Sequence, residues 1–598
     1  MKNASSAGRR LSAPLALVLP LFGGLIGIPA TAVAESTTLA EFMPPGAIGY
    51  AEVAGLAPVI ERIRTSNYLE LLTGSAPFRE LENSGDYQKA QAGRKILETH
   101  LGLDLWTLGK KLLGERVAVG LYITEGESQL QAVGLLRVSD TDILPRIRER
   151  LAPFLVLGSE QIERSETADG VEVLDVAGRA FVALDDRWIA VSGSRDLLGQ
   201  ALALLTGKLL KGNEKRSLAD DEQFRAMMRQ VGTRQVGSDH LVQVFANTEA
   251  IRQAAGGRFA PEKLDNPLGS LLVGGIMELA AQSPYVELHV DVTDGGLALT
   301  ASVAGDNRKL GEAHQSFFSS SSGPGTPPIP ALSGVIGGFS LYRDFTAWYR
   351  HREDLLQDQV LPGFDKFETG LANVLPGKDF GEDVLPLIGS TLTFVAAPQD
   401  YSHLDGRPGV EFPGFGLIVD LARPREAADL FQVFFQTLTA LLNIQAGQQG
   451  RQPWVMTSET YQGVQISYAR YLEKPSGDRL PLAFNFLPAS ARVADKFVLS
   501  SSLGLCRQLV AELQKPTKPE ESPNRNFNFE VHADALADIF EANQEFFHAR
   551  FVQSGTTREE AKEQFSTLLE ILRAFDLVRL STGVRSEAFE VKLEVHWK

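Results

Sequence analysis

The sequence predicts an α+β protein made of two tandem homologous lobes, each a mostly antiparallel sheet with helices packed on one face. Three observations predict it. Apolar and polar residues alternate strictly in hairpins at residues 286–303 and 578–597, which is typical of antiparallel sheets. A strand, a Ser/Gly corner and an amphipathic helix follow one another at residues 187–207 and again at 496–514. Finally, the same order of signals restarts after a Ser/Gly/Pro-rich segment.

The first half alternates strand and helix signals. A helix is expected from Pro58, where proline suits the first turn, and a second one should end at Gly102. Another helix is expected at 141–154, before the helix of the Ser/Gly corner. Strands are expected at 47–53, 116–123, 131–138, 171–176, 180–184, 188–192 and 241–246, before the closing hairpin.

The second half repeats these signals in unchanged order. Strand-like segments at 335–341, 389–395, 416–419, 496–502 and 527–533 correspond to 47–53, 114–120, 134–137, 187–194 and 241–246, and the closing hairpins also correspond. We therefore expect a first lobe at 35–315, a Ser/Gly/Pro linker at 316–330 and a second lobe at 331–598.

The two Ser/Gly corners share a helix stripe at positions i, i+1, i+4 and i+8: Leu197, Leu198, Ala201 and Leu205 in one, Leu505, Cys506, Leu509 and Leu513 in the other. Ser194 and Ser502 are expected to cap these helices. The corners resemble a nucleophile elbow, but the pattern Gly-x-Ser-x-Gly is absent. Because Cys506 corresponds to Leu198, we expect a buried structural thiol and not a nucleophile.

Residues 1–34 have the order of a signal peptide. Lys2, Arg9 and Arg10 precede an apolar stretch, and Ala-Val-Ala at 32–34 is a small-residue cleavage site, so the mature chain should begin at Glu35. The alternative of an uncleaved anchor would need about 20 unbroken apolar residues. The sequence thus predicts a periplasmic or extracellular protein, and no later stretch is expected to span a membrane.

Charge and composition exclude several classes of function. The chain carries 58 basic and 74 acidic residues, so nucleic acids and anionic membranes are not expected as partners. One cysteine allows no internal disulfide. Metal-ligand spacing and phosphate or dinucleotide fingerprints are missing, so no metal or cofactor is expected. His289 and His596 lie on polar faces of half-exposed strands, where solvent is the expected partner.

The loop at residues 397–414 is the best candidate for binding. It is longer than its first-half counterpart and carries Tyr401, His403, Asp405 and Arg407. Long structured loops are often functional, although a plain surface loop explains the same pattern. In addition, 23 of the 33 phenylalanines follow residue 325, which indicates either a bulkier core or a cavity for an apolar ligand such as a lipid.

Residues 43–50, 101–106, 114–119 and 188–198 together resemble a family of secreted bacterial proteins catalogued as a domain of unknown function. The resemblance covers most of the mature chain, but its motifs are turns, strands and caps, and it implies no catalytic residue. We expect an exported, soluble, non-enzymatic binding or assembly protein with a protein or apolar ligand as partner. The alternatives are an exported hydrolase with a site formed across the fold, and a carrier of apolar ligands.

Overall fold

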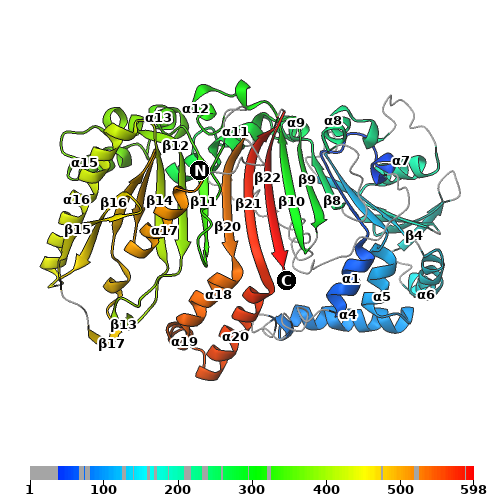
Figure 1. Cartoon of the computed structure of the whole chain (residues 1–598). Coiled ribbons are helices and arrows are strands. Elements are labelled where there is room, and N and C mark those ends of the chain that lie inside the picture. The colour runs from blue at the N-terminus through cyan, green and yellow to red at the C-terminus, as the bar shows by residue number, and fades with distance from the viewer. Residues whose placement is uncertain are drawn as a thin grey trace. The chain divides into compact units, whose positions relative to one another are not determined.

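The structure is a computed structural model of the chain, and it describes residues 38–65, 73, 78, 81–123, 130–138, 140–157, 162–166, 171–185, 187–207, 217–231, 240–257, 260–293, 295–319, 325–450, 452–472, 476–516, 524–585 and 587–598 (Figure 1). The predicted signal peptide lies outside these residues. The chain divides into two compact units. Unit 1 holds residues up to Gly257, Pro284–Ala301 and Trp597, and unit 2 holds Arg258–Ser283, Ser302–His596 and Lys598.

Unit 1 is built on an antiparallel sheet with the strand order β4-β5-β6-β7-β3-β2-β1-β8-β9. Its strands are β1 (Gly49–Ala54), β2 (Arg116–Ile123), β3 (Leu130–Arg137), β4 (Ile162–Glu166), β5 (Glu172–Val176), β6 (Ala180–Leu184), β7 (Trp188–Ser192), β8 (His240–Ala246) and β9 (Val286–Thr293). The next strand, β10 (Gly296–Ala304), begins in this unit.

The helices of unit 1 are η3 (Leu39–Phe42), α1 (Leu56–Thr65), α4 (Gly85–Leu101), α5 (Leu105–Leu113), α6 (Ile143–Leu157), α7 (Arg195–Leu205), η4 (Leu218–Asp220), α8 (Glu222–Val231) and α9 (Thr248–Ala254). A buried ion pair fixes the start of the described chain. Glu52 is fully buried and accepts hydrogen bonds from Arg116, from the Tyr50 hydroxyl at 2.6 Å and from the Thr38 hydroxyl at 2.6 Å. The segment before β1 is therefore tied to the sheet.

Unit 2 contains antiparallel strands that pair in the order β15-β16-β18-β19-β14-β12-β11-β20-β21. Its strands are β11 (Gly337–Tyr342), β12 (Ile388–Ala397), β14 (Gly414–Leu421), β15 (Trp454–Tyr461), β16 (Val464–Tyr471), β18 (Ala489–Val493), β19 (Lys496–Ser500), β20 (Arg525–His532), β21 (Phe575–Arg585) and β22 (Ala588–Trp597). A small separate sheet pairs β13 (Asp405–Pro408) with β17 (Ser476–Leu480).

Helices in unit 2 cover both faces of the sheet, whereas the sequence predicts one covered face. Val498 of β19 packs with Cys506 and Leu509 of α17, while its neighbour Phe497 packs with Ala427 of α16. Successive residues of a strand point to opposite faces, so α16 and α17 lie on opposite sides. The predicted single covered face is wrong for this unit. Alternation of apolar and polar residues in the hairpins indicates one buried face, whereas β19 has apolar residues on both of its faces.

The helices of unit 2 are α10 (Pro267–Gly269), η5 (Ser270–Gly274), α11 (Gly275–Gln282), η6 (Asn307–Lys309), α12 (Glu312–Gln315), α13 (Phe345–Arg350), α14 (Arg352–Leu355), α15 (Pro362–Ala372), η7 (Phe380–Val384), η8 (Leu385–Leu387), α16 (Pro424–Gln448), η9 (Leu482–Asn485), α17 (Leu503–Leu513), α18 (Ala533–Ala542), α19 (Gln544–Gln553) and α20 (Arg558–Ala574). Helices α10, η5 and α11 lie in residues 258–283, which belong to unit 2. The chain then returns to unit 1 for residues 284–301.

The strands of the two units follow the same order when β1 is matched with β11, β2 with β12, β3 with β14, β7 with β19 and β8 with β20. A buried polar position also recurs. Glu52 lies opposite Gln243 in unit 1, and Ser340 lies opposite Asn528 at the corresponding place in unit 2. This order is what a duplicated protein requires, and homology of the lobes stays a prediction.

The described residues of the predicted linker at 316–330 belong to the core of unit 2. Phe317 and Phe318 are buried against Phe589, with ring centroids 5.9 and 5.4 Å away. The Ser319 amide donates to Asn526 Oδ1 at 2.7 Å. The chain instead passes from unit 1 to unit 2 after Ala301. The predicted linker is not a linker here because Phe317 and Phe318 bury apolar surface in spite of the Ser, Gly and Pro residues around them.

Candidate functional site

Of the four predicted loop residues, Tyr401 is the one that is buried, and its side chain bonds both within the loop and to a segment outside it. Its hydroxyl donates to the Phe412 carbonyl at 2.8 Å and lies 2.5 Å from Asn485 Oδ1. Burial, with a smaller contribution from the Glu411 charge, raises the pKa of Tyr401 above its ordinary value. The phenol therefore stays protonated at neutral pH and acts as a structural donor.

Two buried asparagines hold the same loop in place. Asn485 accepts from the Phe412 amide at 2.9 Å and donates to the Val410 carbonyl at 2.9 Å. Asn543 accepts from the Glu411 amide at 2.7 Å and donates to the Glu411 carbonyl at 2.9 Å. Side-chain amides thus satisfy the backbone of an irregular segment, which makes the loop an ordered part of unit 2.

The other three predicted residues, His403, Asp405 and Arg407, are exposed. Arg407 pairs with Glu411 at 3.0 Å, and Asp405 begins the short strand β13. The Tyr401 hydroxyl is bonded within the loop, while Arg407 is paired with a carboxylate. The geometry therefore favours the interpretation of a surface loop over that of an acid–base site.

The Ser/Gly corners cap their helices as predicted. Ser194 Oγ accepts from the Leu197 amide at 3.4 Å, and Ser502 Oγ accepts from the Leu505 amide at 3.3 Å. Cys506 is fully buried, and burial raises the pKa of its thiol to about 12. A protonated thiol without solvent access is a poor nucleophile, so the corner at Cys506 is structural.

A cluster of two histidines and two carboxylates is buried in unit 1, on β8 and β9. His240 Nδ1 lies 2.6 Å from Asp291, and His289 Nδ1 lies 2.6 Å from Glu287. The second nitrogen of His289 lies 3.5 Å from Asp291, and the two imidazole rings are 5.1 Å apart. The solvent expected around His289 is therefore replaced by acidic side chains, because this face of β9 is covered.

Carboxylates hold the two imidazoles of the histidine cluster in place. Both nitrogens of His289 face carboxylates, and His240 Nε2 is buried without a hydrogen-bond partner in the described part of the chain. Nor do the described residues contain a group of three His, Cys, Asp or Glu side chains placed to hold a metal ion. The pairing instead fixes the orientation of each imidazole.

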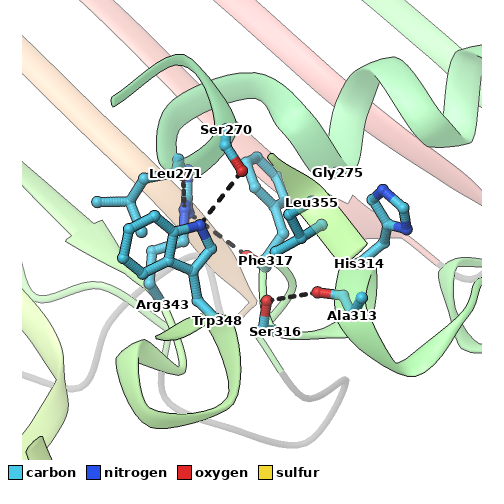
Figure 2. A pocket seen from close by; sticks show the side chains of 10 residues that line it. All are labelled: Ser270, Leu271, Gly275, Ala313, His314, Ser316, Phe317, Arg343, Trp348 and Leu355. Atoms are coloured by element: carbon cyan, nitrogen blue, oxygen red, sulfur yellow. Dashed lines mark hydrogen bonds between the residues drawn. The ribbon is translucent and has the colours of Figure 1, made fainter. Parts of the chain in front are cut away.

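A small cavity in unit 2 contains a buried arginine (Figure 2). Arg343 donates to the carbonyls of Leu271, Leu272 at 3.1 Å, Phe317 at 3.4 Å and Tyr342, and its guanidinium stacks on the Phe317 ring at 3.7 Å. Leu271 and Leu272 lie in the π-helical turn η5, whose altered hydrogen-bond register leaves carbonyl oxygens for other donors.

Burial lowers the pKa of Arg343 to about 9, so the side chain remains a cation at neutral pH. Among the described residues no carboxylate pairs with it, and the carbonyl dipoles balance its charge. The cavity has a volume of about 10 Å³, which is room for one water molecule. It is too small for the lipid that the phenylalanine content suggests as one alternative.

The helix α16 carries the surface that the sequence interpretation missed. Residues 430–450 contain no Asp, Glu, Lys or Arg. Val433 is 47 % exposed and Ile444 is 60 % exposed, and Leu441 and Leu442 are also exposed. In length and composition α16 could cross a membrane, although no such stretch is expected from the sequence, and 17 % of its most apolar window is buried. Interspersed Gln, Asn and Thr residues break the apolar run and conceal this signal.

Comparisons with known proteins add no functional assignment. No family model matches the chain, and no curated protein matches it. Among solved structures, crystal form I of TP0453 matches with 11 % identity and a TM-score of 0.23, covering 47 % of this chain and 83 % of that one. Crystal form IV of the same protein matches with 12 % identity and a TM-score of 0.22, covering 45 % and 81 %. At these TM-scores the likeness carries no argument about fold or function.

Proposed function

We propose that this protein is exported and works without catalysis, as a binding or assembly protein that presents the outer face of α16 to its partner. The exposed, charge-free surface of α16 carries the proposal. Contiguous exposed apolar surface on a globular protein commonly marks an interaction site. The leader at residues 1–34 supports a location outside the cytoplasm.

The polar clusters of the described residues support a non-catalytic role. Cys506 and Tyr401 are protonated and buried, and both nitrogens of His289 face carboxylates. The guanidinium of Arg343 donates hydrogen bonds to backbone carbonyls. Each of these groups is used for holding the fold, whereas the exposed apolar side chains of α16 are not used in this way.

Native mass spectrometry of the protein purified from its own cell envelope tests this proposal. We expect the wild-type protein to carry a bound lipid, peptide or protein, and the double variant Leu441→Asp/Ile444→Asp to lose it. Leu268→Asp is the matched control, because Leu268 is 67 % exposed and lies on α10. A bound species retained by the double variant, or turnover of a substrate by the pure protein, would contradict the proposal.

A further inference from the structure

We infer that the outer face of α16 binds the surface of an uncharged lipid bilayer, with the helix axis parallel to the membrane plane. This inference rests on the proposed binding function and names its partner. Five residues form the face, Val433, Thr437, Ala440, Leu441 and Ile444, and they occur at positions i, i+4, i+7, i+8 and i+11. At 3.6 residues per turn these positions share one side of the helix.

The absence of charge favours lipid over a protein partner. The core of an interface between proteins is poor in charge, but its rim is polar. Residues 430–450 have no charged side chain on any side, in a chain of which 22 % is charged. This run is about 30 Å long at 1.5 Å per residue. Contact with lipid requires such a surface, because a charged group in hydrocarbon is costly.

The two ordinary explanations of an apolar helix do not apply to α16. A core helix would be mostly buried, but 17 % of the most apolar window of α16 is buried. A signal sequence would lie at the N-terminus, whereas α16 begins at Pro424. Packing in unit 2 therefore explains the buried side of this helix but not its exposed apolar side chains Val433, Leu441 and Ile444.

Contacts on one side of α16, its inner face, hold the helix against the strands of unit 2. Phe431 stacks on Phe497 with ring centroids 4.9 Å apart, and Gln432 Nε2 donates to Ser467 Oγ at 2.9 Å. Asn443 donates to the Trp454 carbonyl at 2.8 Å and accepts from its amide at 2.7 Å. Crossing the bilayer would break these contacts at both ends of the helix, so only the outer face is free to enter lipid.

Aromatic side chains flank the C-terminal half of α16. Asn443 ties the helix to Trp454, whose ring lies 6.0 Å from that of Tyr471. Leu472, which follows Tyr471, is 67 % exposed. The Trp454 indole N–H is buried and the Tyr471 hydroxyl donates to the Ala483 carbonyl at 3.1 Å, so the polar groups of both rings are held inside the protein. Leu472 is the residue of this strand edge that adds exposed apolar surface.

Charge also decides which lipid the surface accepts. An amphipathic helix that binds anionic lipid has Lys and Arg on its polar side. None occurs in residues 430–450, and the whole chain has a formal net charge of −16. Binding should therefore come from burial of apolar surface, depend little on salt, and weaken when the lipid is anionic.

Flotation of the purified full chain with phosphatidylcholine vesicles tests the inference. We expect the wild-type protein to float with the vesicles equally at low and high salt, and less well when phosphatidylglycerol is added. The triple variant Val433→Asp/Leu441→Asp/Ile444→Asp should bind at least about tenfold more weakly. The control Leu81→Asp/Ile96→Asp/Leu268→Asp changes three exposed residues that do not belong to α16 and should bind like wild type. Circular dichroism melts confirm that both variants fold.

Three results would overturn the inference. Wild-type protein that stays with the lipid-free fraction excludes a lipid partner, and so does equal flotation of the α16 variant. The third result would come from sedimentation equilibrium in the absence of lipid. If the wild-type protein forms a dimer, the α16 variant does not, and neither binds vesicles, then the face is a protein interface. That outcome keeps the proposed binding function and rejects lipid, whereas substrate turnover in the native preparation would reject the function itself.

Discussion

At the scale of single residues, buried polar groups in this protein serve to hold backbone and helices in place. Glu52 collects hydrogen bonds from three side chains, and Asn485 satisfies the backbone of the loop at 397–414. A buried polar group costs free energy unless it is bonded, so such residues can be exchanged only with a loss of stability. Two other buried side chains, Cys506 and Arg343, allow direct tests.

Cys506 should be unreactive in the folded protein. Burial raises the pKa of its thiol to about 12, so the reactive thiolate is scarce at neutral pH. We expect a thiol reagent to label Cys506 only after denaturant is added, and Cys506→Ala to lower the free energy of unfolding by about 1–2 kcal/mol. Fast labelling of native protein would contradict the structural role of this residue.

Arg343→Met should destabilise unit 2. The substitution keeps apolar bulk but leaves carbonyls of η5 without their donor, and we expect a loss of about 2–4 kcal/mol in the free energy of unfolding measured with denaturant. Arg308→Met is the control, because Arg308 is exposed and pairs with the neighbouring Asp306. Equal stability of the two variants would show that Arg343 does not hold the π-helical turn.

At the scale of elements, each Ser/Gly corner joins a strand to a helix by the same capping bonds. An ion pair then connects the second of these helices, α17, to the edge strand β15. Arg507 Nε and Nη2 lie 2.6 Å from the two oxygens of Glu459. Paired N–H donors on a carboxylate are the strongest arrangement of such an ion pair.

The contribution of this pair should depend on pH. The Arg507 hydrogen bonds lower the pKa of Glu459, so the stabilisation is complete above the ordinary glutamate pKa and is lost as the pH falls through the folded value. We expect Arg507→Gln to cost about 0.5–1 kcal/mol at pH 7, since both side chains are partly exposed. In acid, below both pKa values, wild type and variant should unfold with equal free energy.

The matched control is Glu459→Gln, which removes the titrating group. Denaturant unfolding of this variant should show no pH-dependent difference from the double variant Glu459→Gln/Arg507→Gln. A difference between wild type and Arg507→Gln that stays constant from pH 7 to acid would assign the effect to packing of Arg507 and not to the ion pair.

At the scale of the whole molecule, the chain is acidic, contains one cysteine and repeats one order of antiparallel strands in its two units. Cross-links by disulfides are impossible within one chain, so both units depend on ordinary apolar cores. The core around α17 illustrates this, since it combines Val395, Ile418, Val498 and Leu509 from four elements.

Export predicts a defined start of the mature protein. N-terminal sequencing of protein from the cell envelope should give Glu35 as the first residue, because Ala-Val-Ala at 32–34 follows the charged and apolar parts of the leader. Changing Ala32 and Ala34 to larger residues should block cleavage. Envelope protein that starts at Met1 would contradict the prediction.

The sequence alone determined the local structure of this protein. Caps at Ser194 and Ser502, the helix end at Gly102 and the α+β class follow from rules that act over a few residues. Strand pairing depends on residues far apart in the chain, so the order of strands in the two units, the place of residues 258–283 in unit 2 and the burial of His289 were decided by tertiary structure. The same holds for the candidate surface: the sequence shows that residues 430–450 carry no charge, but only packing decides which face of α16 is left uncovered.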